Sequence, residues 1–168
     1  MRKPPSPPKP NAPLADAIKF VEAHMRVGVF CPCCGQFAKI YKRKLNVCMA
    51  YALGLIAREQ KRRPNEWLHA PSYLHKAAVR GPTVRGGDFA KLVHWGALIP
   101  KPEIRNDGSN RAGFYKITKT GLDFVDGKIK LAKHIHLYAG RFCGFSTELT
   151  TFRQALGEDF DYDELMRA

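Results

Sequence analysis

Four of the five cysteines stand within a stretch of eighteen residues. Cys31 and Cys34 are separated by two residues and followed by Gly35, and we call residues 31–35 the cysteine knuckle. This spacing lets the chain curl so that both sulfurs and several backbone N–H groups point at one ion. Cys48 is the best third ligand. The sequence therefore predicts a structural zinc ion held by Cys31, Cys34 and Cys48, or a degenerate knuckle that keeps the turn and binds no ion.

Other chemistry is less well supported by these residues. A thiol nucleophile needs a general base, and no catalytic motif ties a histidine or an acid to the cysteines. His134 and His136 share one face of an expected strand and could hold a metal, although exposed histidines on hairpins are much more common. The sequence shows no carboxylate pair, phosphate-binding loop or complete metal triad. We therefore expect a binding protein and not an enzyme.

Charge is the strongest feature of the composition. The 168 residues include 28 Lys and Arg but only 15 Asp and Glu, for a net charge of +13. Residues 1–147 hold 26 of these bases and 9 of the acids, so the surplus lies before an acidic C-terminal end. A body this positive attracts polyanions and gains free energy from counterion release. Nucleic acid is the expected partner, and a merely well-solvated basic protein is the alternative.

Basic residues also follow the cysteine knuckle directly. Lys39, Lys42, Arg43 and Lys44 are interspersed with Ile40, Tyr41 and Leu45, in a segment that we expect to be a strand or a short helix with a basic outer face. Such a face suits contact with phosphates, and it equally suits plain solvation.

Hydrophobic periodicity and helix-breaking residues divide the chain into four segments. They are a disordered proline-rich tail (1–13), an N-terminal helix with the cysteine knuckle (14–45), a central domain (46–127), and a C-terminal hairpin with a short acidic helix (128–168). The first helix is expected to turn Leu14 and Ile18 inward and to end at Gly28. This mixture of helices and hairpins predicts the α+β class.

The central domain has a recognisable order of elements. Asn46 is a favourable N-cap for its first helix. The expected elements are a helix (47–63), a short strand (66–71), a helix (72–79), a helix (87–95), a strand (98–105), a tight turn, a strand (111–118) and a helical turn (119–127). Phe89, Leu92 and Val93 should form the buried face of the third helix.

The pattern across the last of these elements resembles the winged helix-turn-helix superfamily. The residues that carry the resemblance are Gly96, Leu98, Ile99, Gly113, Tyr115, Ile117, Thr118 and Gly121. It covers residues 46–127, and its members occupy packing and turn positions rather than catalytic ones. The cysteine knuckle resembles half of a zinc ribbon, since no second Cys-x-x-Cys follows. The whole chain is similar to uncharacterised small proteins of phages and mobile elements.

The resemblance implies which residues would contact DNA. In a helix-turn-helix the second helix of the pair enters the major groove. The implied contacts are Lys91 and His94 on that helix, Arg80, Thr83 and Arg85 just before it, and Arg105 and Arg111 on the wing, with Lys42, Arg43 and Lys44 as phosphate clamps. This helix lacks the Arg, Asn and Gln that usually read bases, so we expect contact dominated by the DNA backbone.

Two functions are compatible with these features. The first is a small basic winged-helix DNA-binding protein of phage or mobile-element type. The second is a protein-binding winged-helix module that docks on a host protein or ribonucleoprotein and inhibits or redirects it, with Trp67, Tyr73 and Trp95 as surface anchors. No apolar run is long enough to span a membrane and the start of the chain does not look like a signal peptide, so we expect a cytoplasmic protein.

Overall fold

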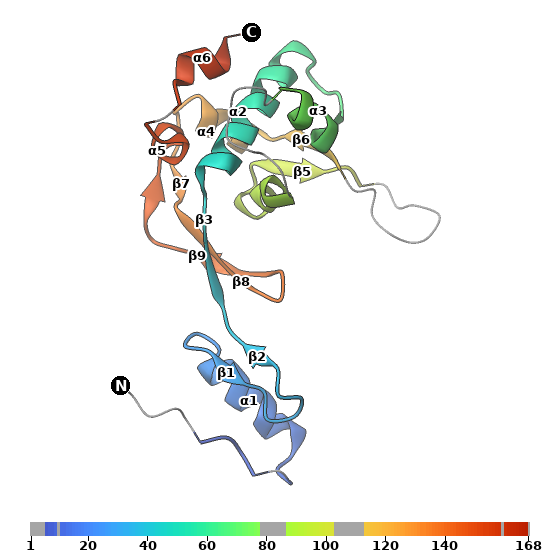
Figure 1. Ribbon diagram of the computed structural model, residues 1–168, viewed down its shortest axis with the longest axis vertical. Helices are drawn as coiled ribbons and strands as arrows, with labels where there is room; N and C mark the ends of the chain where they lie inside the picture. The colour runs from blue at the N-terminus through green and yellow to red at the C-terminus, as the bar shows by residue number, and fades with distance from the viewer. Residues whose placement is uncertain (1–5, 10, 78–86, 103–112, 159, 168) are drawn as a thin grey trace. The chain divides into compact units, whose positions relative to one another are not determined.

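A computed structural model describes residues 6–9, 11–77, 87–102, 113–158 and 160–167 (Figure 1). The chain folds into two compact units, and each is built from two separate stretches of sequence. The N-terminal unit comprises residues 1–43 and 136–145, and the core unit comprises residues 44–135 and 146–168. Helices and small sheets occur in both units, so the α+β class is confirmed.

The two units interleave along the chain. The expected segments follow one another in sequence, whereas the structure groups the hairpin of residues 136–145 with the N-terminal stretch and returns residues 146–168 to the core unit. None of the helices in the described ranges is long and apolar enough to cross a membrane.

The core unit contains most of the regular structure. In chain order its elements are α2 (Val47–Arg62), β4 (Leu68–His69), α3 (Ala70–Ala77), the 3₁₀ helix η1 (Gly87–Trp95), β5 (Leu98–Pro100), β6 (Phe114–Ile117), α4 (Lys119–Val125), β7 (Leu131–Ala132), β10 (Leu149–Thr150), α5 (Phe152–Leu156) and α6 (Tyr162–Met166).

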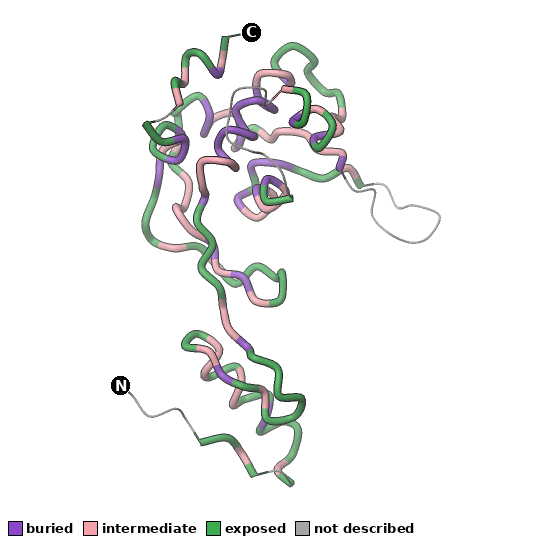
Figure 2. Tube along the Cα trace, in the orientation of Figure 1, coloured by how far each residue is buried: buried purple, intermediate pink, exposed green. Residues whose placement is uncertain are grey.

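Helix α2 forms the centre of the core unit (Figure 2). It begins where predicted, because the Asn46 side chain accepts a hydrogen bond of 3.0 Å from the Met49 N–H. Residues 49–57 are all buried, and α3, η1, α4, α5, α6 and β6 all contact this helix. A helix covered on every side needs an apolar surface all round, which the sequence of α2 provides. Gly54 allows close packing, since a Cβ atom there would lie 2.6 Å from a methyl carbon of Leu165 on α6.

A three-stranded antiparallel sheet in the order β4-β6-β5 packs beside α2. Its register pairs Leu68 with Tyr115 and Leu98 with Ile117. The buried Gln60 ties α2 to this sheet, because its side-chain oxygen accepts a hydrogen bond of 2.8 Å from the Ile117 N–H. The amide nitrogen of Gln60 donates to the Glu66 carbonyl at 2.6 Å, so both polar groups of this buried side chain are satisfied.

The helix before β5 differs from its prediction. The apolar spacing predicts an α-helix that buries Phe89, Leu92 and Val93, but residues 87–95 form a 3₁₀ helix. With three residues per turn, positions three apart lie in one row, so the buried row is Phe89, Leu92 and Trp95. Trp95, which we expected near the surface, is 4% exposed and donates its indole N–H to the Ala132 carbonyl at 2.6 Å.

The glycines and the threonine around β5 and β6 have identifiable structural roles. Gly96 has a φ of +67°, which lets the chain leave η1 in a left-handed conformation. The Thr118 hydroxyl oxygen caps α4 by accepting from the Gly121 N–H at 3.0 Å. A Cβ atom on Gly121 would lie 2.3 Å from the backbone oxygen of Ala97, so only glycine fits there.

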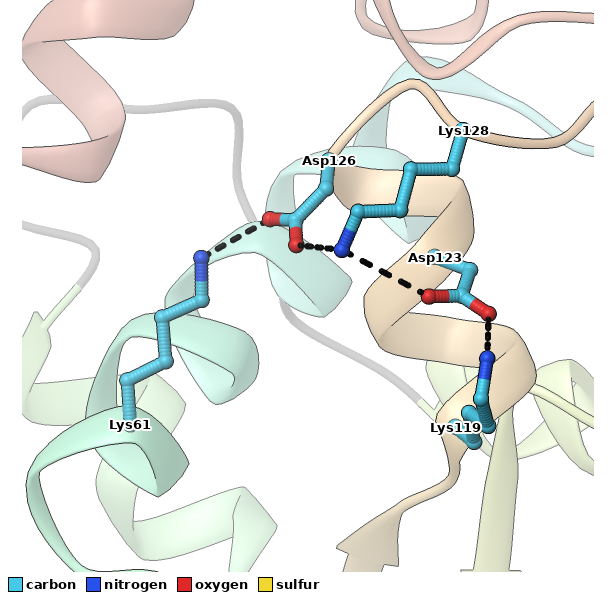
Figure 3. A network of polar contacts seen from close by, with 5 residues as sticks. All are labelled: Lys61, Lys119, Asp123, Asp126 and Lys128. Carbon is cyan, nitrogen blue, oxygen red and sulfur yellow. Dashed lines mark hydrogen bonds and ion pairs between the residues drawn. The ribbon is translucent and has the colours of Figure 1, made fainter.

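Ion pairs join the C-terminal ends of α2 and α4 (Figure 3). Lys61 contacts Asp126 at 2.8 Å, and Lys128 contacts both Asp126 at 3.1 Å and Asp123 at 3.7 Å. Lys119 pairs with the other oxygen of Asp123. Hydrogen bonds from Lys61 and then Lys128 hold the pKa of Asp126 below its usual value despite partial burial.

The N-terminal unit has fewer buried residues (Figure 2). Its elements are α1 (Leu14–His24), β1 (Val29–Phe30), β2 (Phe37–Ala38), β3 (Tyr41–Lys44), β8 (His134–Tyr138) and β9 (Arg141–Phe145), and the boundary between the units falls within β3 and β8. Strands β1 and β2 form an antiparallel hairpin, and the second sheet has the order β3-β8-β9.

Helix α1 does not bury the face that its sequence predicts. It ends at His24, before Gly28, whose φ of +105° reverses the chain toward β1. Ala17 is buried, but Leu14 and Ile18 are exposed. Helical spacing therefore identifies the apolar stripe correctly but does not show whether a partner element covers it.

Candidate nucleic-acid interface

Strand β3 presents the basic residues that the sequence predicts as phosphate clamps. Lys42, Arg43 and Lys44 are all exposed, as is Tyr41. The strand lies at the edge of its sheet. Because side chains alternate along a strand, Tyr41 and Arg43 share one face, and the Arg43 guanidinium carbon lies 5.8 Å from the centroid of the Tyr41 ring.

A cavity beside this strand gathers further positive charge. Its lining consists of Arg26, Lys39, Ile40, Tyr41, Lys42 and His136, and its volume is about 430 Å³. All six residues belong to the N-terminal unit. We call this cavity the basic hollow. No acidic side chain contributes to its lining.

A single backbone contact explains how these residues meet. The Ile40 N–H donates a hydrogen bond of 2.7 Å to the Met25 carbonyl. This bond holds the segment before β3 against the chain that leaves α1, so Arg26 comes next to Lys39 although the β1–β2 hairpin separates them in sequence. Sequence reasoning missed Arg26 and assigned His136 only to metal binding, because neither local pattern reveals this long-range contact.

The cations of the basic hollow have no acidic partner within the described part of the chain. Among the described residues, Arg26, Lys39 and Lys42 form no ion pair, whereas the core unit pairs many of its bases. The paired bases include Lys61, Lys91, Lys119, Lys128 and Lys133. Within the described ranges, these three side chains therefore differ from the paired bases of the core unit.

Two of the predicted DNA contacts, Lys91 and His94, lie on η1 and are less favourable for anion binding. Asp88, Lys91 and His94 are spaced by three residues and therefore lie in one row of this 3₁₀ helix. The Lys91 ammonium group pairs with the Asp88 carboxylate, which offsets its charge. His94 is half-buried. This row can make a small number of polar contacts and offers little for reading a base sequence.

The remaining predicted contact residues lie outside the described part of the chain. They are Arg80, Thr83, Arg85, Arg105 and Arg111.

The aromatic anchors predicted for a protein interface are not all available. Trp95 is buried, and Tyr73 is half-buried with its hydroxyl donating to the Leu55 carbonyl at 3.1 Å. Trp67 is half-buried beneath the Lys116 ammonium group, which lies 4.8 Å from the ring centroid. The expectation that these three aromatics form an exposed set is therefore wrong for Trp95. The exposed aromatics of the described chain lie instead in the N-terminal unit, at Phe30, Phe37, Tyr41, Phe142 and Phe145.

The cysteine knuckle forms the turn of the β1–β2 hairpin. The Cys31 N–H donates to the Gln36 carbonyl at 2.8 Å, and the Gly35 N–H donates to the Cys31 carbonyl at 2.9 Å. Hydrogen bonds from the backbone N–H groups of Cys34 and then Cys33 lower the pKa of the Cys31 thiol. Desolvation, and then the negative charge of Cys31, raise the pKa of Cys33. A lowered pKa of Cys31 is the direction that metal ligation requires, because cysteine binds a metal as its thiolate.

This geometry supplies only part of a zinc site. Cys31 and Cys34 fit two ligand positions, but a structural zinc site needs four. The described residues contain no cluster of three or more His, Cys, Asp or Glu side chains that could hold a metal ion. Cys48 lies in the first turn of α2 and belongs to the core unit. A zinc ion held by Cys31, Cys34 and Cys48 thus stays a prediction.

Comparison with known proteins gives no match of any kind. No family model, no curated protein and no solved structure matches this chain.

Proposed function

We propose that this chain is a small basic DNA-binding protein with a winged-helix core, of phage or mobile-element type. One observation carries the proposal: α2, β4, α3, η1, β5 and β6 follow one another in the winged-helix order, and β6 lies between β4 and β5 in an antiparallel sheet. In this interpretation η1 is the groove helix. The segment between β5 and β6, which carries Arg105 and Arg111 in the sequence, is the wing.

The charges of the chain support backbone contact over base reading. The row of Asp88, Lys91 and His94 contains none of the Arg, Asn and Gln side chains that usually read base edges, and Lys91 is already paired with Asp88. A net charge of +13 nevertheless favours phosphates through counterion release. The proposed protein therefore binds many duplex sequences with similar affinity.

A salt titration with labelled duplex DNA tests this function. The affinity of the full chain for a 20-base-pair duplex should fall steeply with salt, since the logarithmic slope is about −0.9 for each phosphate neutralised. The double substitution Arg105→Ala and Arg111→Ala should weaken binding to all duplex sequences and reduce this slope by about two.

The matched control removes two exposed lysines elsewhere. Lys9→Ala combined with Lys130→Ala changes the net charge equally, and neither lysine forms an ion pair within the described ranges. This control should keep the salt slope within about one of the original value. Equal losses in both double variants would show that net charge alone drives binding and would remove the wing from the proposal.

A protein-docking module is the competing function. It loses support from the burial of Trp95, one of its three expected anchors. Retention of a stable protein partner by the untagged chain, with no binding to duplex DNA at low salt, would replace the proposed function with this one.

A further inference from the structure

We infer that the basic hollow of the N-terminal unit is a second nucleic-acid site, which takes an unstacked base of a single strand and its flanking phosphates. This inference goes beyond the proposed function, because it concerns single strands and a cavity that belongs neither to η1 nor to the wing. It stands on the charge, the aromatic content and the size of the hollow.

The charge of the hollow fits a phosphate backbone. Arg26, Lys39 and Lys42 converge on one cavity, and within the described chain none of them is neutralised by an acid. Arg43 is not part of the lining, but it is exposed and its guanidinium carbon lies 5.8 Å from the centroid of the Tyr41 ring. Several cations along a short path can contact successive phosphates, which is how proteins track the backbone of a single strand.

An aromatic ring lies among these cations. The Tyr41 side chain lines the hollow and is 49% exposed, although burying a tyrosine ring would favour folding. Every base has a π-face that can stack on such a ring, and this stacking does not depend on base identity. In a duplex the faces of the bases are covered by their neighbours. The ring therefore favours a strand whose bases are unstacked.

The size of the hollow also fits an unstacked base better than a duplex. Its volume of about 430 Å³ falls within the range of roughly 300–1,000 Å³ that is typical of small-molecule sites. A cavity of this size can hold a group as large as one nucleotide and is too small to receive a double helix. Phe37, only two residues before Lys39, is also exposed, and its ring packs against Phe30 at a centroid distance of 5.1 Å.

The test compares two labelled probes on the full chain by fluorescence anisotropy at one salt concentration. The first is a twelve-residue oligothymidylate, and the second is an abasic strand of equal length and charge. The oligothymidylate should bind about tenfold more tightly, since stacking on an aromatic side chain is worth a factor of this order. An oligouridylate of the same length then shows whether DNA or RNA is preferred.

Substitutions at Tyr41 isolate the stacking contribution. Tyr41→Ala should weaken oligothymidylate binding about tenfold and leave abasic binding unchanged, whereas Tyr41→Phe should retain most of the affinity. Lys39→Ala with Lys42→Ala should weaken both probes by removing phosphate contacts, and Lys130→Ala should weaken neither by more than about twofold.

Two results would overturn the inference. One is equal affinity for the abasic and thymidylate strands, which would reduce the hollow to a nonspecific polyanion site. The other concerns a third labelled probe, polyglutamate. If Tyr41→Ala weakens polyglutamate binding as much as oligothymidylate binding, the hollow would be assigned to acidic proteins. Duplex binding, measured in parallel, should weaken in the variant with Arg105→Ala and Arg111→Ala and stay unchanged in Tyr41→Ala. Failure here and failure of the proposed function are therefore distinguishable.

Discussion

The two units use their apolar side chains in opposite ways. Among the described residues, the twelve largest fully buried side chains all belong to the core unit. Eight of the ten exposed large apolar side chains belong to the N-terminal unit, which is the smaller of the two. Burial of apolar surface is the main favourable contribution to folding, so the core unit must carry most of the stability. The N-terminal unit keeps apolar and cationic groups at its surface, where they are accessible for binding.

A leucine-to-alanine substitution in each unit should test this difference most clearly. Leu53 is fully buried in α2, whereas Leu14 is 66% exposed at the start of α1. Leu53→Ala should lower the free energy of unfolding by about 2–5 kcal/mol, because it removes buried contacts and leaves a cavity. Leu14→Ala should change it by less than about 0.5 kcal/mol. Urea unfolding monitored by circular dichroism measures both, and a large effect of Leu14→Ala would contradict the comparison.

A glycine substitution tests how tightly the core unit is packed. Gly121→Ala should destabilise the protein by about 1–3 kcal/mol, since the new methyl group would collide with the rigid backbone oxygen of Ala97. Gly87→Ala is the matched control, because beyond its chain neighbours no atom of the described residues lies within 4 Å of the added Cβ. Thermal unfolding of both variants should show a lower Tm for Gly121→Ala only. An unchanged Tm in that variant would show that β5 can move away from α4.

Acid should weaken the ion pairs between α2 and α4. The pKa of Asp126 is lower in the folded chain than in the unfolded chain, so its contribution to stability is present above the ordinary aspartate pKa of about 3.9. That contribution is lost as the pH falls through the lower, folded pKa. Asp126→Asn should cost about 0.2–1 kcal/mol at neutral pH and nothing at the acidic end. Urea unfolding of both proteins between pH 2 and 7 measures the difference, and a gap independent of pH would exclude the ion pair as its cause.

The smallest expected difference concerns two neighbouring thiols. Cys31 has a lowered pKa and Cys33 a raised one, so Cys31 should be alkylated faster by iodoacetamide near neutral pH. Cys31→Ser and Cys33→Ser variants, followed by mass spectrometry, separate the two rates. Equal rates would show that the backbone N–H groups do not stabilise the Cys31 thiolate.

Metal content decides whether those thiols serve zinc. One equivalent of zinc that is lost in Cys31→Ser and Cys48→Ser is the result expected from the predicted ligand set. Less than about a tenth of an equivalent in the protein purified without chelators would reject the site.

Features with local signals could be predicted from sequence. Asn46 caps α2 as expected, because a cap depends on a side chain and the backbone three residues away. The order of elements from α2 to α4 follows from periodicity and breakers, and the α+β class follows from that order. Thr118 and Gly121 belong to the sequence pattern that resembles the winged helix. In the structure Thr118 caps α4 and Gly121 avoids a clash with the backbone of Ala97.

Features that depend on distant contacts could not be predicted. The choice between α and 3₁₀ geometry in η1 shifts the buried row from Val93 to Trp95, and the sequence fits either spacing. The basic hollow requires the Ile40–Met25 hydrogen bond and the arrival of His136 from a distant hairpin. No local pattern in either segment indicates the other. The five arginine and threonine positions assigned to DNA contact outside the described ranges stay predictions.

The interleaved connectivity has a consequence for the integrity of the molecule. The chain passes between the units in β3, in β8 and again directly after β9, so a single proteolytic cut in one of these passages leaves at least one other peptide connection between the two units. Removing the first 43 residues would leave an incomplete unit, because the hairpin of residues 136–145 would lose most of the strand β3 with which it pairs. A minimal fragment for crystallisation or domain mapping therefore has to excise both stretches and rejoin residues 135 and 146 with a short linker.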